Sequence, residues 1–391
     1  LNPKRDDCTY PFKGLCGGGV TLKLAEAVAI ILEVDPELVY SHLDLITLGT
    51  AADLVPLLDE NRSIVYHGLK SLEKTEKPGL HALLKVSNLL EKELTVGRLI
   101  FGAAPRINAA GRLGDANRAV ALFSTENPIE AAEIAKELDE ENRNRQDIQQ
   151  TIVDEALLKV NAECDLQNEN AIVLWEEGWH QGVIGIVASR IKEEFHRPTV
   201  IIAMENGVGK GSARSIFNFD LYENLTKCAH HLDGFGGHPM AAGLTISKSN
   251  LPLFRESFIT LANNALSDSD LVGTLTIEAE MKLSEINGRF MEFLSKLAPF
   301  GPGNMRPQFV SRKVEIAGNP RLVGNVDHLK FSAMQNGKAF GAIAFNMGKY
   351  YSDLLSGKPF DLAYVVEENE WQGRKSIQLN IRDIKLRGGV S

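Results

Sequence analysis

Long apolar segments are absent from this sequence of 391 residues. No run approaches the roughly 18 apolar residues that a membrane-spanning helix needs. The N-terminus, from Leu1 to Asp7, has no apolar signal-peptide core. These absences argue against a membrane protein and predict a cytoplasmic chain. The initiator methionine is also missing, so we expect the sequence to be a segment of a longer protein.

Paired cysteines and an excess of positive charge are missing as well. The four cysteines, Cys8, Cys16, Cys164 and Cys228, lack CxxC spacing, which argues against a disulfide framework or a cysteine-ligated zinc site. The net charge is −9, from 42 Lys and Arg against 51 Asp and Glu. A protein that coats nucleic acid nonspecifically through an overall positive charge is therefore not expected. A local basic groove stays compatible with this charge, because salt screens charges beyond ~8–10 Å.

The composition, with 44 % hydrophobic and 24 % charged residues, is that of an ordinary globular protein. The length predicts about two to three domains. Residues 1–126 alternate loops with apolar segments, which is typical of the later part of an α/β domain. We expect one helix at about residues 20–32, after a glycine-rich turn at 14–19, and a helical stretch at about 38–49.

Residues 127–163 predict one long helix, because they contain no glycine or proline after Pro128 and have apolar residues at helical spacing near both ends. The stretch from Asp139 to Asp147 is almost wholly polar. A helix with a polar centre is explained as a solvent-bridging connector between two domains. Asn127 is the expected cap.

The rest of the chain divides into a second α/β domain and a β-rich domain. Residues 164–263 predict strands at 171–175 and 199–203 and helices at 183–195 and 220–232. Residues 264–391 predict a small β-barrel of the OB-fold type, whose usual ligand is single-stranded nucleic acid or sugar. Its expected strands are 275–277, 309–316, 328–334, 339–345, 360–366 and 377–384.

The most informative motif is the string GGHPMAAG at residues 236–243. Gly236 and Gly237 permit a close approach of the backbone to a ligand. His238 supplies a donor that titrates near neutral pH. The small residues that follow leave room for a bulky anionic ligand.

Asp53, Arg106 and Arg112 are further candidates, each with an ordinary structural alternative. Asp53, within Leu48–Pro56, is either a helix-cap or turn residue or a carboxylate held against a metal. Arg106 and Arg112 flank a small-residue turn, and are either solvated surface arginines or bidentate contacts to phosphate.

The string GVGKGSARS at residues 207–215 is not a P-loop, because Gly211 follows Lys210. On a strand, Ser212 and Arg214 lie on one face and make a good site for a terminal phosphate.

Histidines and aromatic residues give weaker signals. His180 precedes a helix whose first amides favour an anion, although a structural role is equally compatible. His230-His231 is interpreted as structural, because adjacent helix positions point about 100° apart. Phe300 and Trp371 either stack on bases or pack in turns.

These motifs together resemble the DHH phosphoesterase family, and within it the RecJ exonucleases. The string at 236–243 is similar to the family's GGHxxAAG motif, and Leu48–Pro56 is similar to its fourth metal-binding motif. The resemblance covers essentially the whole chain in order. It implies the C-terminal part of a DHH catalytic domain at 1–126, a connector helix at 127–163, a DHH-associated substrate-binding domain at 164–263 and an OB-fold at 264–391.

The resemblance implies processive hydrolysis of single-stranded DNA from its 5′ end, in DNA repair and recombination. It assigns Asp53 to a metal and His238 to the scissile region. Arg106, with Arg112 as a second candidate, is assigned to the substrate phosphate. The pair Ser212 and Arg214 is assigned to the 5′-phosphate. The remaining residues expected to contact substrate are Gly236, Gly237 and His180.

The resemblance also implies a pair of Mn²⁺ or Mg²⁺ ions, which one aspartate cannot hold. The family's other metal motifs, Asp-His-His among them, are absent, and we expect them upstream of Leu1 in a longer parent. The fragment alone is therefore expected to bind DNA without hydrolysing it. The implied partners are single-stranded DNA, a single-strand-binding protein and a helicase, with no membrane.

Two alternatives stay open. A DHH-family phosphodiesterase for short oligonucleotides is disfavoured by the extra β-rich domain, since a short substrate needs no extended binding surface. A catalytically inactive scaffold that binds single-stranded DNA is compatible with every residue of the sequence.

Overall fold

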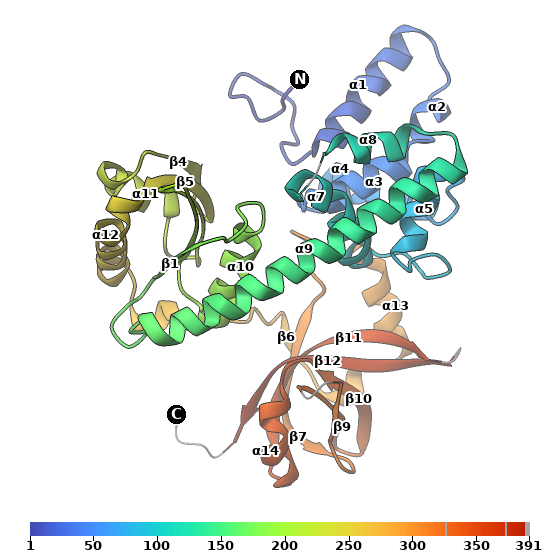
Figure 1. The fold of residues 1–391 in the computed structure, drawn as a ribbon. Helices are drawn as coiled ribbons and strands as arrows, with labels where there is room; N and C mark the ends of the chain where they lie inside the picture. Colours follow the sequence, from blue (N-terminus) through green and yellow to red (C-terminus); the bar gives the residue numbers. More distant parts are fainter. Residues whose placement is uncertain (114, 325–326, 372–373, 388–391) are drawn as a thin grey trace. The chain divides into compact units, whose positions relative to one another are not determined.

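The computed structural model describes residues 1–113, 115–324, 327–371 and 374–387. The chain forms two compact units (Figure 1). The first unit comprises residues 1–72, 95–97 and 275–391, and the second comprises residues 73–94 and 98–274. In the part of the chain described, no helix is both long and apolar enough to cross a membrane.

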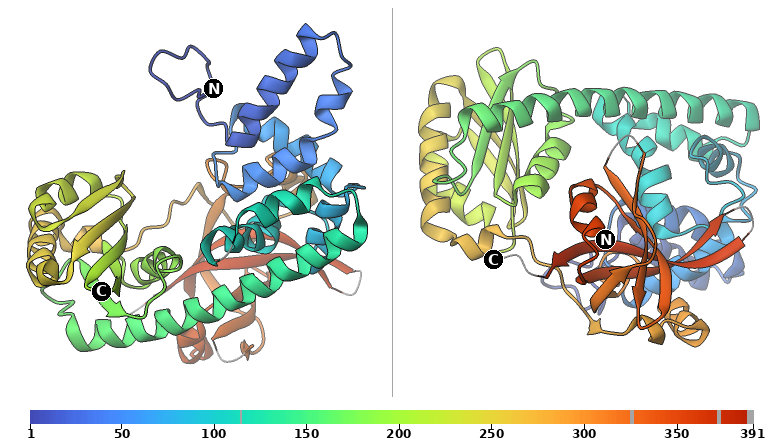
Figure 2. Two further views of the ribbon diagram at one scale, coloured as in Figure 1. Left: turned by 45° about the horizontal axis from the view of Figure 1, so that its top comes forward. Right: turned by 90° about the horizontal axis from the view of Figure 1, so that it is seen from below.

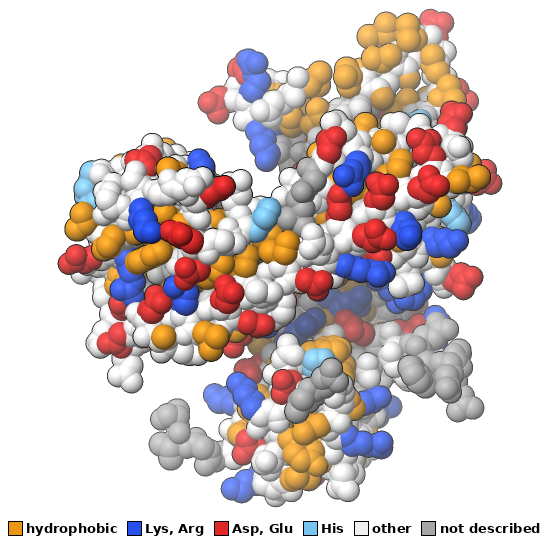
Figure 3. Space-filling view, in the orientation of Figure 1, with side chains coloured by type: hydrophobic (Ala, Val, Ile, Leu, Met, Phe, Trp, Pro, Cys, Tyr) orange, Lys and Arg blue, Asp and Glu red, His pale blue; other side chains and the backbone are white. Residues whose placement is uncertain are grey.

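The N-terminal part of the first unit consists of helices α1 (Gly17–Ile31), α2 (Glu37–Tyr40), α3 (Leu43–Ala52) and α4 (Asp59–Leu72). α1 begins inside the expected glycine-rich turn, because the Cys16 thiol caps it by accepting a hydrogen bond from Gly19 N at 3.3 Å. The helical stretch expected at 38–49 is divided between α2 and α3. An exposed apolar surface on and after α1 (Figure 3) is made of Leu24, Val28, Ile30, Ile31 and Leu32.

The C-terminal part of the first unit is a seven-stranded sheet in the order β6-β7-β11-β12-β10-β9-β8. A further pairing of β7 with β9 curls the sheet around one core, as in an OB-type barrel. The strand expected at 275–277 is wrong, because pairing with β7 begins only at Ala279. The elements are β6 (Ala279–Glu280), α13 (Gly288–Lys296), β7 (Gln308–Ile316), β8 (Arg321–Val323), β9 (His328–Gln335), β10 (Lys338–Ala344), α14 (Tyr351–Leu355), β11 (Phe360–Trp371) and β12 (Arg374–Leu386).

The second unit begins with helices, of which α9 (Pro128–Glu163) is the longest described. The Asn127 side chain accepts a hydrogen bond from Ile129 N at 3.0 Å, which confirms the expected start of α9. The expectation of a solvated centre is partly wrong: Asp139 and Asn142 are only 5 % and 3 % exposed, because α7 packs against α9 there. The preceding helices are α5 (Pro78–Val86), α7 (Ala104–Leu113) and α8 (Asn117–Ser124), while α6 (Val96–Arg98) spans the sequence boundary between the units.

A five-stranded sheet in the order β1-β2-β3-β5-β4 follows α9. One face of this sheet packs against α11 and α12. On the other face, the part formed by β1 and β2 packs against α10 and the end of α9 (Figure 2). The expected strands 171–175 and 199–203 and helix 183–195 are confirmed, whereas α11 ends five residues before the expected position 232. The elements are β1 (Ile172–Glu177), α10 (Ile184–Phe195), β2 (Thr199–Glu205), β3 (Val208–Arg214), α11 (Leu221–Lys227), β4 (Gly234–His238), β5 (Ala241–Ser247) and α12 (Leu251–Ala265).

Candidate nucleic-acid-binding site

Three neighbouring strands of the second unit, β3, β5 and β4, carry four of the predicted site residues on one face. This outer face is opposite to the face that packs against α11 and α12, because side chains alternate along a strand. The strand register arranges it in three rows, which are Arg214–Ala241–His238, Ser212–Gly243–Gly236 and Lys210–Thr245–Gly234. The structure therefore brings Ser212, Arg214, Gly236 and His238 to one surface, as alternation along β3 predicts for the first two.

Ser212 and Arg214 form a direct pair. Arg214 Nη1 donates to Ser212 Oγ at 3.1 Å and to the Ala213 carbonyl at 2.8 Å. Burial lowers the pKa of the Arg214 guanidinium, and the positive charge of Arg112 lowers it further. Because arginine stays charged even so, this half-buried cation favours an anionic ligand.

The N-terminus of α10 adjoins the same pair. Gly185 lies in its first turn, and a Cβ at this position would be 3.0 Å from Ser212 Oγ and 3.1 Å from Arg214 Nη2. The N-terminus of a helix carries a partial positive charge. In α10, Ile184 N donates to the His180 carbonyl and Ile186 N to the Val183 carbonyl, which leaves the Gly185 amide for a ligand. A hydroxyl, a guanidinium and a helix N-terminus thus converge on one point, an arrangement that suits a phosphate.

Arg112 and Arg145 add further positive charge around this point. Arg112 Nη1 donates to the Gly182 carbonyl at 3.1 Å, in the loop that leads to α10. Arg145, from α9, has a pKa lowered first by burial and then by Arg112, and its Nε is buried without a partner. Among the described residues, no carboxylate forms an ion pair with Arg112, Arg145 or Arg214. Sequence reasoning missed Arg145, because it interpreted the polar centre of α9 as solvated.

Arg106 is held inside the second unit. Its Nε and Nη2 lie 2.8 and 2.7 Å from Asp139 Oδ1, and the side chain is 15 % exposed. Nη1 donates to the Gly102 carbonyl at 2.6 Å, and Nη2 also donates to the Val86 carbonyl at 3.1 Å. These contacts occupy all three nitrogens, so the geometry favours Arg112 over Arg106 as a candidate for contact with a phosphate.

The two glycines before His238 differ in what the fold requires of them. Gly237 has φ +152°, and a Cβ there would lie 2.4 Å from the Ala241 carbonyl oxygen, so the backbone itself demands glycine. A Cβ on Gly236 would meet nothing within 4 Å. His238 is exposed at the end of β4, where its Nδ1 accepts a hydrogen bond from Met240 N at 3.4 Å.

His180, His231 and Phe300 each have contacts within their own unit. His180 Nδ1 accepts from Gly182 N at 3.1 Å, which orders the loop that also binds Arg112. His231 Nε2 lies 3.0 Å from Ser257 Oγ. In the first unit, Phe300 packs against the barrel core, and Arg306 lies 4.5 Å from its ring centroid. The side chain of Trp371 lies outside the described residues.

Asp53 lies in the first unit, at the C-terminal end of α3. Its side chain is exposed, and the segment after it is held firmly: Leu57 N donates to the Pro302 carbonyl at 2.6 Å, and Asn61 Nδ2 donates to the Pro56 carbonyl at 2.9 Å. Within the described residues, no group of three or more His, Cys, Asp and Glu is placed to hold a metal ion. Asp53 alone does not make a metal centre, and no chemical step follows from it here.

Comparisons with known proteins match nearly the whole chain. The DHHA1 domain family matches residues 168–264, and the RecJ OB domain family matches residues 277–383. The single-stranded-DNA-specific exonuclease RecJ of Bacillus subtilis is 36 % identical over 98 % of this chain and 48 % of its own length. The corresponding protein of Dickeya dadantii is 35 % identical over 98 % of this chain and 69 % of its own length.

A solved structure is similar as well. The crystal structure of RecJ from Thermus thermophilus in complex with Mg²⁺ superposes with a TM-score of 0.84 at 29 % identity, over 97 % of this chain and 57 % of that one. A second structure of the same protein contains Mn²⁺ and gives a TM-score of 0.83. The chain thus spans about half the length of the Bacillus subtilis and Thermus thermophilus relatives.

Proposed function

Since this chain belongs to the RecJ family of single-stranded-DNA-specific exonucleases, we propose that it acts in the hydrolysis of single-stranded DNA from the 5′ end. The observation that carries the proposal is the cluster of Ser212, Arg214 and the α10 N-terminus, surrounded by arginines without carboxylate partners. A terminal phosphate monoester carries more negative charge than an internal diester. The cluster therefore selects a strand end over the middle of a strand.

Beyond the terminal phosphate, the strand follows the row Arg214–Ala241–His238 across the sheet. Two strand spacings separate Arg214 from His238, about 9.6 Å between Cα atoms. In this proposal the bond to be cut is the phosphodiester between the first and second nucleotides, and it lies beside His238. The barrel of the first unit is a second proposed binding surface for single-stranded DNA, as in other OB-folds.

Divalent metal chemistry is part of the same proposal. The Thermus thermophilus relative is solved with Mg²⁺ and with Mn²⁺, ions that prefer carboxylate ligands. Asp53 is exposed and is the proposed ligand of one ion, while the described residues supply no complete set. A bound pair of such ions activates water and stabilises the leaving oxygen. A helicase and a single-strand-binding protein are the proposed partners that deliver the strand, in the cytoplasm.

The test compares oligonucleotides that differ only in their 5′ end. Affinity for 5′-phosphorylated and 5′-hydroxyl strands is measured by fluorescence anisotropy in chelator, for the wild type, Ser212→Ala and Arg214→Met. Arg214→Met should lose affinity for the phosphorylated strand by about 1.5–3 kcal/mol, the contribution of a charged hydrogen bond. Its affinity for the hydroxyl strand should change little.

Lys227→Met is the matched control for the loss of one positive charge, because Lys227 lies on α11, behind the sheet, and pairs with Glu223. Equal losses by Arg214→Met on both strands would refute the terminal-phosphate role.

A further inference from the structure

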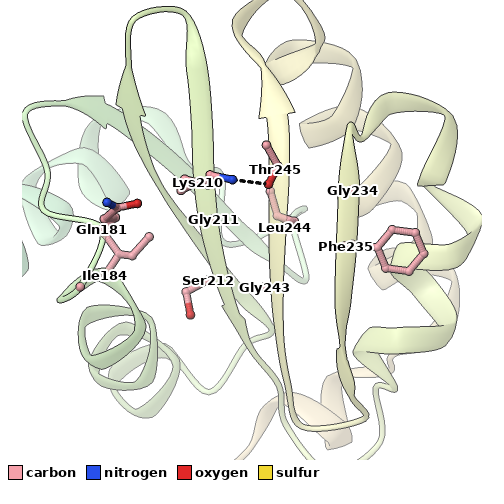
Figure 4. Close-up of a pocket in the computed structure, with 11 residues that line it drawn as sticks. Gln181, Ile184, Lys210, Gly211, Ser212, Gly234, Phe235, Gly243, Leu244 and Thr245 are labelled. Atoms are coloured by element: carbon pink, nitrogen blue, oxygen red, sulfur yellow. Dashed lines mark hydrogen bonds between the residues drawn. The ribbon is translucent and has the colours of Figure 1, made fainter. Parts of the chain in front are cut away.

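A cavity of about 530 Å³ lies on the outer face next to Ser212 (Figure 4). Its floor includes the backbone of Gly234 and Gly243. A Cβ on Gly234 would meet nothing within 4 Å, and one on Gly243 would meet only the Gly211 carbonyl oxygen at 3.9 Å. Neither glycine has the left-handed φ of Gly237. The fold therefore does not require glycine at either position, and a ligand that lies flat on the backbone explains both.

The far end of this cavity carries hydrogen-bonding groups. Lys210 and Thr245 are register partners on β3 and β5, and Lys210 Nζ donates to Thr245 Oγ1 at 3.0 Å (Figure 4). An ammonium has three donors, so two remain. Within the described residues no carboxylate pairs with Lys210, whereas Lys248 and Lys227 are both paired. Gln181, from the loop before α10, also lines the cavity.

The position of this cavity relative to the phosphate site limits its occupant. Lys210 lies two residues from Ser212 along β3, about 6.6 Å away, on the side opposite to the row that ends at His238. With the terminal phosphate at Ser212 and the next phosphodiester beside His238, the part of the terminal nucleotide left for the cavity is its base. A flat floor with donors at one edge suits a nucleobase better than a tetrahedral phosphate.

We propose that this cavity binds the base of the 5′-terminal nucleotide, with the ring on the glycine floor and its hydrogen-bonding edge toward Lys210 and Thr245. Guanine is the preferred base, because O6 and N7 are adjacent acceptors that a lysine can contact together. The inference rests on the proposed function, which fixes the place of the terminal phosphate. It adds a modest preference for the first base to DNA binding that is otherwise independent of sequence.

The experiment uses short 5′-phosphorylated single strands with a 3′ fluorophore, in chelator. One carries deoxyguanosine as its first nucleotide, and the other carries an abasic tetrahydrofuran unit there. Lys210→Met and Thr245→Val should weaken binding of the guanosine strand, Lys210→Met by about fivefold or more, and leave the abasic strand unchanged. Gly243→Val should do the same by filling the floor, and thermal unfolding shows whether it folds. Lys227→Met should change neither affinity.

If Lys210→Met weakens both strands equally, Lys210 contacts backbone phosphate and the base-binding inference is wrong. If the wild type binds guanosine and abasic strands equally, the cavity takes no base. Failure of the proposed function has a different signature, because the wild type would then show no preference for 5′-phosphate over 5′-hydroxyl on any strand.

Discussion

Replacing Arg106 by methionine should destabilise the second unit rather than abolish its binding of DNA. Arg106 and Asp139 are a buried ion pair, with side chains 15 % and 8 % exposed. Breaking such a pair by removing one partner costs about 3–5 kcal/mol. In the wild type Arg143 Nη2 lies 2.6 Å from Asp139 Oδ2. This second cation remains available to Asp139 after the substitution, so we expect a cost near the lower end of that range, about 3 kcal/mol. In a unit of this size that lowers Tm by roughly 6–12 °C.

The assay is thermal and urea unfolding followed by tryptophan fluorescence, since Trp175 and Trp179 both report on the second unit. Arg143→Met is the matched control: it removes a cation from the same Asp139, but its side chain is 72 % exposed, so the loss should stay within about 1 kcal/mol. If Arg106→Met keeps wild-type stability and loses affinity for single-stranded DNA, Arg106 serves the substrate and the structural assignment is refuted.

Three further predictions concern other parts of the chain. Burial is the largest single influence and raises the pKa of the Asp361 carboxyl, but the hydrogen bonds from Arg387, Lys313 N and Arg312 and the charge of Arg387 together outweigh it, so the pKa is lowered. Asp361→Asn should therefore destabilise the barrel at pH 7, and the difference from wild type should vanish as pH falls through the lowered pKa; a constant difference down to pH 2 would contradict this. Gly237→Ala should cost at least about 1–3 kcal/mol of stability, because of its φ of +152° and the close Ala241 carbonyl, and unchanged unfolding would disprove that reading. The purified chain should bind single-stranded DNA without cutting it, since the described residues contain no group of three or more His, Cys, Asp and Glu placed to hold a metal ion; Mn²⁺-dependent cleavage that chelator abolishes would count against this.

Features set by neighbouring residues could be predicted from the sequence. Asn127 and Pro128 mark the start of α9 because a cap acts within one turn. Ser212 and Arg214 share a face because alternation is a property of any strand. The strands β1 and β2 follow from continuous apolar runs that only a sheet covered on both faces can bury.

Features that depend on distant partners could not be predicted. The burial of Arg106 in an ion pair depends on Asp139, which lies 33 residues from Arg106 along the chain. Arg145 became a candidate only when the fold placed it beside Arg112. Nothing local separates Gly236, which faces open space, from Gly237, which the backbone requires.

The most direct test is a crystal structure of this chain with a 5′-phosphorylated trinucleotide of single-stranded DNA, without metal. The account predicts the terminal phosphate within hydrogen-bonding distance of Ser212 Oγ, the Arg214 guanidinium and the Gly185 amide at the start of α10. A terminal phosphate bound elsewhere, with these three groups free of it, would contradict the account.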